Sequence, residues 1–235
     1  TAKNALCMLD ILHRMNDEIW AIEVKNSTSV KDYHLTDASL QYFVMKEAGY
    51  APDKFFLMHI NNQYIKNGEL TDEFFHLEDI TDKVLSKQTW VEENLKRLLV
   101  MLESKQEPNI SIGAHCSSPF ACDFVHHCWK HIPENSVFEL YRGGNKAWEL
   151  YEQGILKIED IEDDFPLTHF QHLQRKGLRN QEQYINKEAI KNMISSWQFP
   201  LYFFDFETVF PAIRVLDGTR PYQQIPFQYS LNISR

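Results

Sequence analysis

The stretch EIWAIEVKN, residues 18–26, places a glutamate and a lysine inside a run that otherwise has the composition of a buried β-strand. Side chains alternate between the two faces of a strand, so Glu23 and Lys25 share one face while Val24 points to the other. A charged pair that emerges from an apolar strand directly before a polar loop favours a functional site. An ordinary Glu–Lys pair at the end of a surface strand is the alternative interpretation.

The run ALCMLDILH, residues 5–13, reads as a preceding strand, and the polar turn at 14–17 joins the two strands as a hairpin. This pairing brings Asp10 within reach of Glu23. Two carboxylates that converge from neighbouring strands suit Mg²⁺ or Mn²⁺, hard cations that prefer oxygen ligands and keep some of their waters. Lys25 beside them is placed to orient or help deprotonate a water and to stabilise charge developing on a phosphate.

Strands and helices alternate along the chain, which indicates an α/β fold. The segment 35–49 predicts a helix, because Leu40, Phe43 and Val44 recur on one face and Gly49 ends the pattern. The other expected elements are strands at 54–62, after Pro200 and at 225–234, a long amphipathic helix at 82–104, a helix around 145–153, and two polar helices at 167–176 and 186–197.

The pattern D-x12-E-x-K, formed by Asp10, Glu23 and Lys25 and followed by a helix with polar residues, resembles the RecB-type branch of the PD-(D/E)xK nucleases. The resemblance implies a restriction-endonuclease-like core, in which a mixed central sheet is flanked by helices, and hydrolysis of DNA phosphodiester bonds. It also implies that Asp10 and Glu23 bind the Mg²⁺ or Mn²⁺ ion and that Lys25 assists catalysis.

The same group of nucleases carries a Gln-x-x-x-Tyr helix beside the site. In the helix DASLQYFVM, Asp37 and Gln41 lie four residues apart on one face and match that helix best, although neither register gives Gln-x-x-x-Tyr itself. The resemblance implies that Gln41 contacts the metal ligands or a phosphate. Many members also use a histidine ligand from an N-terminal helix, which here would lie before Thr1.

Three cysteines, Cys116, Cys122 and Cys128, stand at even spacing in GAHCSSPFACDFVHHCW, residues 113–129, and the chain has one other, Cys7. Their clustering favours a metal site over a disulfide framework and fits a reducing cytoplasm. The C-x2-C pairs typical of zinc knuckles are missing. The alternatives are buried cysteines without a ligand and a zinc site completed by one of four nearby histidines, which are His115, His126, His127 and His131.

The triplet resembles that of the iron–sulfur nucleases of the RecB-like group, including the CRISPR-associated ones, in which three cysteines follow the nuclease core and a fourth precedes it. The resemblance implies a 4Fe–4S cluster on Cys116, Cys122 and Cys128, with Zn²⁺ as the alternative. We expect the fourth cysteine upstream of Thr1, because Cys7 falls within an expected strand and suits a small apolar core position.

The stretch FFDFET, residues 203–208, carries Asp205 and Glu207 on one face of an expected strand. It resembles the first motif of the DEDD, or DnaQ-like, exonucleases of the ribonuclease H-like fold, whose Asp-x-Glu binds two metal ions. A family of largely uncharacterised bacterial proteins, classed as a domain of unknown function, has a similar order of features: a RecB-type nuclease, then a cysteine triplet, then DFET…QIPFQYS. This resemblance covers essentially the whole chain. It implies a second metal site at Asp205 and Glu207 whose partner acids would lie beyond Arg235.

We therefore expect three parts. A nuclease-like core spans 1–160 with the cysteine segment at 113–131, a helical connector spans 161–198, and the start of a ribonuclease H-like domain spans 199–235. Because the chain begins with Thr1 and both ends run into strand-like segments, we expect it to be a piece of a larger protein.

Composition limits the possible partners. No apolar run approaches the roughly 18–20 residues of a membrane span, so we expect no membrane association and a cytoplasmic location. A net charge of −9 argues against nonspecific nucleic-acid binding by the whole surface, although acidic metal sites contribute to that charge. We expect a nuclease of DNA repair or defence, with DNA favoured over RNA. The alternatives are a noncatalytic module that binds nucleic acid or protein on a degenerate nuclease fold, and a zinc-stabilised interaction domain.

Overall fold

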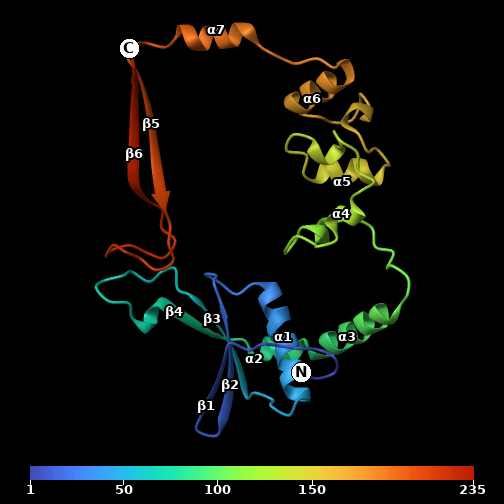
Figure 1. Cartoon of the computed structure of the whole chain (residues 1–235), viewed down its shortest axis with the longest axis vertical. Coiled ribbons are helices and arrows are strands. Elements are labelled where there is room, and N and C mark those ends of the chain that lie inside the picture. The colour runs from blue at the N-terminus through green and yellow to red at the C-terminus, as the bar shows by residue number, and fades with distance from the viewer. The chain divides into compact units, whose positions relative to one another are not determined.

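A computed structural model describes all 235 residues of the chain (Figure 1). Contacts divide the chain into two units, one made of Thr1–Pro108 together with Tyr202–Ser234 and the other of Asn109–Leu201. Strands and helices are mixed along the chain, so the expected α/β class is confirmed. The assignment of the chain to three functional parts stays a prediction.

A mixed four-stranded sheet, in the order β1-β2-β3-β4, organises the first unit. Its strands are β1 (Ile11–Met15), β2 (Glu18–Lys25), β3 (Lys54–Ile60) and β4 (Phe75–Asp79). Strands β1 and β2 form an antiparallel hairpin, β3 runs parallel to β2, and β4 is antiparallel to β3. The hairpin turn at Asn16 has a φ of 57°, which asparagine tolerates better than most residues.

The first strand is shorter than predicted. It begins at Ile11 instead of residue 5, so the expected strand at 5–13 is wrong over most of its length. Lys3 and Asn4, with φ values of 49° and 60°, form a turn closed by backbone hydrogen bonds between Ala2 and Ala5, and residues 6–10 are in no strand. Asp10 therefore lies just before β1, in a bend.

Helix α1 (Asp32–Glu47) confirms the predicted helix, which starts three residues earlier than expected. His34 Nδ1 accepts the backbone N–H of Lys31 at 3.2 Å and so satisfies a donor at the helix N-terminus. Asp32 in the first turn and Lys46 in the last turn complement the helix dipole. Gly49 follows with a φ of 85°, the left-handed conformation that ends many helices.

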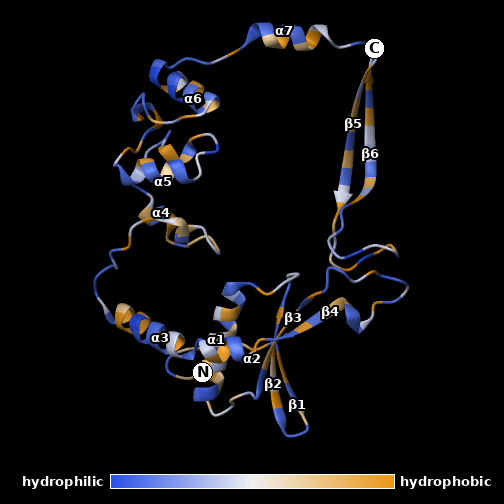
Figure 2. Ribbon diagram, turned by 180° about the vertical axis from the view of Figure 1, so that it is seen from behind, coloured by the Kyte–Doolittle hydropathy of each residue, from blue (hydrophilic) through white to orange (hydrophobic).

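The long helix predicted at 82–104 is two helices, α2 (Thr81–Ser86) and α3 (Gln88–Glu103), separated at Lys87. The side-chain amide of Gln88 donates to the carbonyls of Val84 at 2.9 Å and Ser39 at 3.1 Å. These bonds hold the start of α3 to α2 and to α1. Helix α3 carries hydrophobic and hydrophilic residues on different sides (Figure 2).

The core of the first unit lies between the sheet and helices α1 and α2. Six of its members are fully buried: Ala38 of α1 together with Ala21, Phe55, Leu57, Ile80 and Val84. Burying a side chain of leucine or phenylalanine size stabilises a fold by about 1.5–3 kcal/mol. This cluster therefore fixes α1 against one face of β2 and β3.

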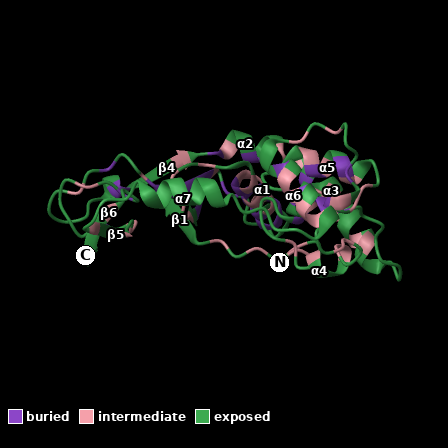
Figure 3. Cartoon of the chain, turned by 90° about the horizontal axis from the view of Figure 1, so that it is seen from above, coloured by how far each residue is buried: buried purple, intermediate pink, exposed green.

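The second unit is small and mostly helical. Its elements are the short helix α4 (Val125–Cys128), α5 (Asn145–Glu152), α6 (His169–Asn180) and α7 (Lys187–Ser195). The core gathers around α5, where Val137, Leu150, Ile158 and Ile161 are fully buried. Figure 3 shows buried residues on α5, while α7 is exposed along its whole length.

The last two strands, β5 (Leu201–Val209) and β6 (Ile225–Ser234), pair with each other as a separate two-stranded sheet. The predicted strands are thus confirmed. Most of their side chains are exposed. The segment between them belongs to the first unit: Lys66 Nζ lies 2.5 Å from Asp217 Oδ1, and Ala212 packs on the Ile60–Phe74 cluster.

Candidate active site

One face of the sheet changes from apolar to polar along β2 and β3. Residues that pair across strands share a face, and the register pairs Ala21 with Phe55 and Lys25 with His59. The apolar pair lies in the core under α1, while the polar pair lies at the carboxyl ends of the two parallel strands. Ligands of open α/β sheets bind outside such strand ends. The predicted site residues Glu23 and Lys25 lie at this end.

Lys25 is held between two carboxylates. Its Nζ lies 2.7 Å from Glu23 Oε1 on the same strand and 2.6 Å from Asp37 Oδ2 on α1. Gln41, one turn further along α1, donates from Nε2 to Asp37 Oδ1 at 3.4 Å. Four residues selected from the sequence, including the weakly matching Asp37, therefore form one connected group.

The two carboxylates fix the charge of Lys25. Burial alone lowers the pKa of the ammonium, but hydrogen bonds from Asp37 and Glu23, and the charges of these two groups, outweigh burial and hold the pKa of Lys25 above its ordinary value. Lys25 is therefore a cation at neutral pH. Of the roles predicted for it, this arrangement favours orienting a water and stabilising negative charge over removing a proton.

Two oxygens at the site are buried and have no hydrogen-bond partner in the protein: Glu23 Oε2 and Gln41 Oε1. Glu23 is only 6% exposed, so neither bulk water nor a side-chain donor satisfies this oxygen. An unsatisfied buried carboxylate oxygen costs free energy unless a donor or a cation occupies the space beside it. The donor set therefore fits an oxygen-preferring ion such as Mg²⁺ or Mn²⁺.

Asp10, just before β1, contacts strand β2 along the edge that faces β1. Its Oδ2 accepts the backbone N–H of Val24 at 2.8 Å, which ties the bend before β1 to β2 next to Glu23. The β1–β2 pairing itself begins at the next residue, with Ile11 opposite Ile22. The hydrogen bond to Val24 occupies one carboxylate oxygen, and the other is left for a ligand or water. Sharing of one ion by Asp10 and Glu23 stays a prediction.

His34 is a site residue that the sequence did not reveal. It is 3% exposed, and its pKa is lowered by burial and, next, by the positive charges of Lys25 and Lys31. His34 is therefore neutral at pH 7, as its acceptance of the Lys31 N–H also requires. The only signal in the sequence was its position one turn before Asp37 on the polar side of the helix.

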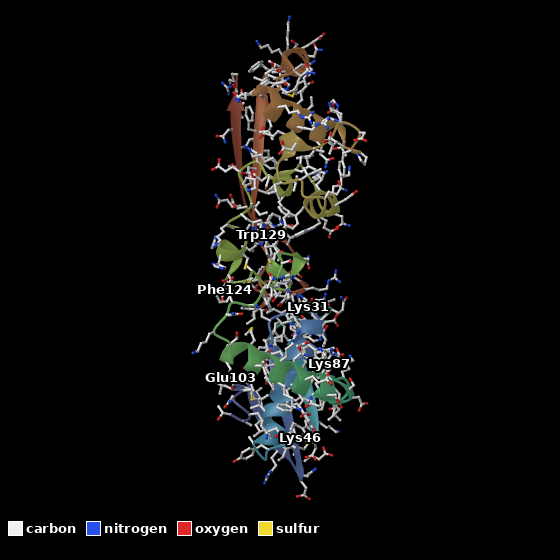
Figure 4. The ribbon with its side chains drawn as sticks, turned by 90° about the vertical axis from the view of Figure 1, so that its right-hand side faces the viewer. Lys31, Lys46, Lys87, Glu103, Phe124 and Trp129 are labelled. Carbon is white, nitrogen blue, oxygen red and sulfur yellow. The ribbon has the colours of Figure 1, made fainter.

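A groove of about 600 Å³ lies in the first unit beside the loops that follow β2 and β3. Lys31, which Figure 4 labels at the start of α1, and Arg220, from the segment between β5 and β6, both line it. Tyr222 of the same segment donates a hydrogen bond to Asn26 after β2. Two cations in an otherwise polar groove suit a phosphate-bearing ligand.

The cysteine triplet lies in the second unit. Cys116 is buried, Cys122 and Cys128 are partly buried, and none forms a disulfide. The N–H of Cys122 donates to the carbonyl of Cys116 at 2.9 Å, which closes the loop between them. Trp129, labelled in Figure 4, packs against Phe138 with tilted rings whose centroids are 4.8 Å apart, and this contact fixes the segment to the core around α5.

Two predicted alternatives for a fourth cysteine-site ligand have other contacts. His131 uses both ring nitrogens, one 2.9 Å from the Cys128 carbonyl and the other 3.0 Å from the Tyr151 hydroxyl. Cys7 does not lie in a strand, contrary to expectation, but packs against the core of the first unit and points at the Gln41 carbonyl, 3.9 Å away. Burial raises the pKa of Cys7, which favours the thiol over the metal-binding thiolate.

Asp205 and Glu207 are exposed on β5. Asp205 Oδ1 accepts the backbone N–H of the next residue at 3.0 Å. The neighbouring rings of Phe204 and Phe206 pack at 4.5 Å, and Phe204 also meets Tyr229 of β6 at 5.5 Å. Neither acid belongs to a group of three metal-ligating side chains.

The chain is similar to one family whose model covers residues 202–235 and is described as Domain of unknown function (DUF2779). No curated protein and no solved structure matches the chain. None of its helices has the length and apolar character that crossing a bilayer requires.

Proposed function

We propose that the chain is a divalent-metal-dependent nuclease that hydrolyses DNA phosphodiester bonds at the carboxyl ends of β2 and β3. One observation carries the proposal: the buried, unpartnered oxygen of Glu23 lies beside a charged lysine at the polar end of a sheet. Such a site is organised to hold a cation and to stabilise a phosphate at the same place.

In this proposal Asp10 and Glu23 hold Mg²⁺ or Mn²⁺, which supplies activation of a water and neutralisation of phosphate charge when bound. Asp37 positions Lys25, and Gln41 holds Asp37 through the 3.4 Å contact between Nε2 and Oδ1. The Lys25 ammonium remains protonated and stabilises the negative charge that develops on the phosphate. Lys31 and Arg220 in the groove contact phosphates of the DNA strand next to the cleaved bond.

The cysteine triplet belongs to the same proposal as a structural element. Cys116, Cys122 and Cys128 would hold a 4Fe–4S cluster, which needs deprotonated thiols free of disulfides. The alternative, Zn²⁺, would require the three sulfur atoms to move closer together, because they do not form a group within 4.8 Å. We propose for Asp205 and Glu207 a second metal site that lacks its partner acids in this chain.

Cleavage of labelled single- and double-stranded DNA with Mg²⁺ or Mn²⁺ tests the proposal. We expect products that disappear with a chelator and in Lys25→Ala. Lys54→Ala is the matched control, because Lys54 begins the neighbouring strand at the opposite end of the sheet and should leave cleavage unchanged. Equal cleavage by Lys25→Ala and the parent chain would contradict the proposed site.

The alternative function is a noncatalytic module that binds nucleic acid or protein on the same fold. The closed ion group of Glu23, Lys25 and Asp37 favours it, because an internally neutralised lysine also serves a purely structural role. Such a module would bind DNA without cutting it, whichever divalent metal is present. Lys25→Ala would then lower only the stability of the fold.

A further inference from the structure

His59, His76 and Glu78 gather on the strand pair β3–β4, outside the group formed by Glu23, Lys25 and Asp37. One ligand atom from each of the three lies within 4.8 Å of the other two. No other set of three or more histidine, cysteine, aspartate or glutamate side chains in the chain meets this geometry. The sequence did not predict this cluster, because β4 itself was not predicted.

Sheet geometry explains why these three side chains meet. His59 and His76 are directly paired across β3 and β4, and their ring centroids are 5.1 Å apart. Glu78 follows His76 by two residues, so it points to the same face and pairs with Leu57. All three side chains therefore project from the same face of the sheet at neighbouring positions. The backbone hydrogen bonds between β3 and β4 set these positions.

Side chains of the cluster have lone pairs available for a metal ion. His59 is 7% exposed, and its Nδ1 lies 3.1 Å from the carbonyl of Ile60. A proton on Nδ1 satisfies that carbonyl and leaves a lone pair on Nε2, the arrangement in which histidines bind metals. Glu78 Oε1 is paired with Lys83 at 2.8 Å, so a metal ion would bind the other carboxylate oxygen or displace this ammonium.

We propose that His59, His76 and Glu78 form a binding site for a divalent transition metal, with Zn²⁺ as the preferred ion. Two imidazoles and one carboxylate suit Zn²⁺, Co²⁺, Fe²⁺ or Mn²⁺ and disfavour Mg²⁺, which selects oxygen ligands. Ligand atoms around one zinc lie roughly 3.4 Å apart, so rotation of the exposed His76 and of the flexible Glu78 side chain closes the site.

Three protein ligands leave coordination positions for water or for an anion. Lys25, the register partner of His59, brings one positive charge next to the proposed ion, but Glu23 and Asp37 bring two negative charges. The surroundings are therefore not repulsive to a cation. The site is independent of the proposed nuclease ion, because it shares no ligand with Asp10 or Glu23.

Titration of the whole chain with Co²⁺ tests the site, because cobalt reports its ligands by colour. We expect the parent chain to show the visible absorption of a nitrogen- and oxygen-ligated cobalt ion. His76→Ala or Glu78→Gln should weaken the affinity for Co²⁺ at least about a hundredfold. Lys83→Met should raise the affinity up to about fivefold, since it removes a competing cation. His13→Ala, which replaces an exposed histidine on strand β1, should bind like the parent chain.

Binding by the cysteines is distinguished in the same spectrum, because thiolate ligands add an intense near-ultraviolet charge-transfer band that His76→Ala does not change. Both substitutions at the cluster are on β4, at an edge of the sheet, and circular dichroism establishes that the variants are folded. Identical cobalt affinity and visible absorption in the parent chain, His76→Ala and Glu78→Gln would overturn the proposal.

Discussion

Lys25 Nζ donates to Asp37 Oδ2 across 2.6 Å and joins strand β2 to helix α1. The same ammonium lies 2.7 Å from Glu23, whose side chain is almost fully buried. Position and charge of the lysine are thus fixed by two carboxylates from different elements. This relationship underlies both the proposed chemistry and the stability of the site.

Removing the cation should destabilise the fold. We expect Lys25→Met to lower the free energy of unfolding by about 2–3 kcal/mol, between the values for exposed and for buried ion pairs, because Glu23 keeps an uncompensated buried charge. The double variant Glu23→Gln/Lys25→Met should lose less than the sum of the two single variants. Urea denaturation measures all three, and strictly additive losses would contradict the coupling.

The Lys25 contribution also has a pH dependence. Because its folded pKa lies above the ordinary 10.5, the contribution is complete below pH 10.5 and is lost as the pH rises through the folded pKa. The stability deficit of Lys25→Met should thus be constant between pH 7 and about pH 10 and shrink only above that range. A deficit that already shrinks between pH 7 and 9 would be inconsistent with this charge state.

His34 should make the fold sensitive to mild acid. Its folded pKa lies below the ordinary 6.5, so the unfolded chain takes up a proton first as the pH falls. The stabilisation is complete above pH 6.5 and is lost as the pH falls through the folded pKa. We expect the free energy of unfolding to fall less between pH 7.5 and about pH 5 in His34→Gln than in the parent chain. A slope unchanged in His34→Gln would refute the assignment.

The strand β2 and helix α1 were predictable because their patterns are local. Alternation in EIWAIEVKN and the apolar face ending at Gly49 indicate both elements. The contact between Lys25 and Asp37 was only partly predictable, since it depends on how α1 crosses the sheet. The match of Asp37 to a family pattern identified the residue but not its partner.

Other features depend on interactions that no local pattern contains. Strand β4, FHLED, is a short edge strand with mostly exposed side chains, and its alternation of apolar and polar residues covers only four positions, too few to predict a strand that would bring His76 and Glu78 to one face. The break between α2 and α3 occurs at Lys87 without glycine or proline, and the side chain of Gln88 stabilises it from outside the local pattern.

The cysteine segment yields a prediction about colour. The chain purified without oxygen should be brown and absorb around 400 nm through thiolate-to-iron charge transfer, and Cys122→Ala should bleach it. Iron and sulfide analysis gives the stoichiometry, and Cys7→Ala is the control because Cys7 lies in the other unit. Colourless anaerobic protein with stoichiometric zinc would show that the iron–sulfur assignment is wrong.

The most direct test of the central claim compares the two acidic pairs in one cleavage experiment. Single-turnover cleavage of labelled DNA with Mn²⁺ is measured for Asp10→Asn/Glu23→Gln and for Asp205→Asn/Glu207→Gln, after circular dichroism establishes that both are folded. We predict a loss of at least about a hundredfold in the first variant, because metal ligands are removed, and the parent rate in the second. Unchanged cleavage in the first variant together with its loss in the second would show that the strand-end site on β2 is not the nuclease site.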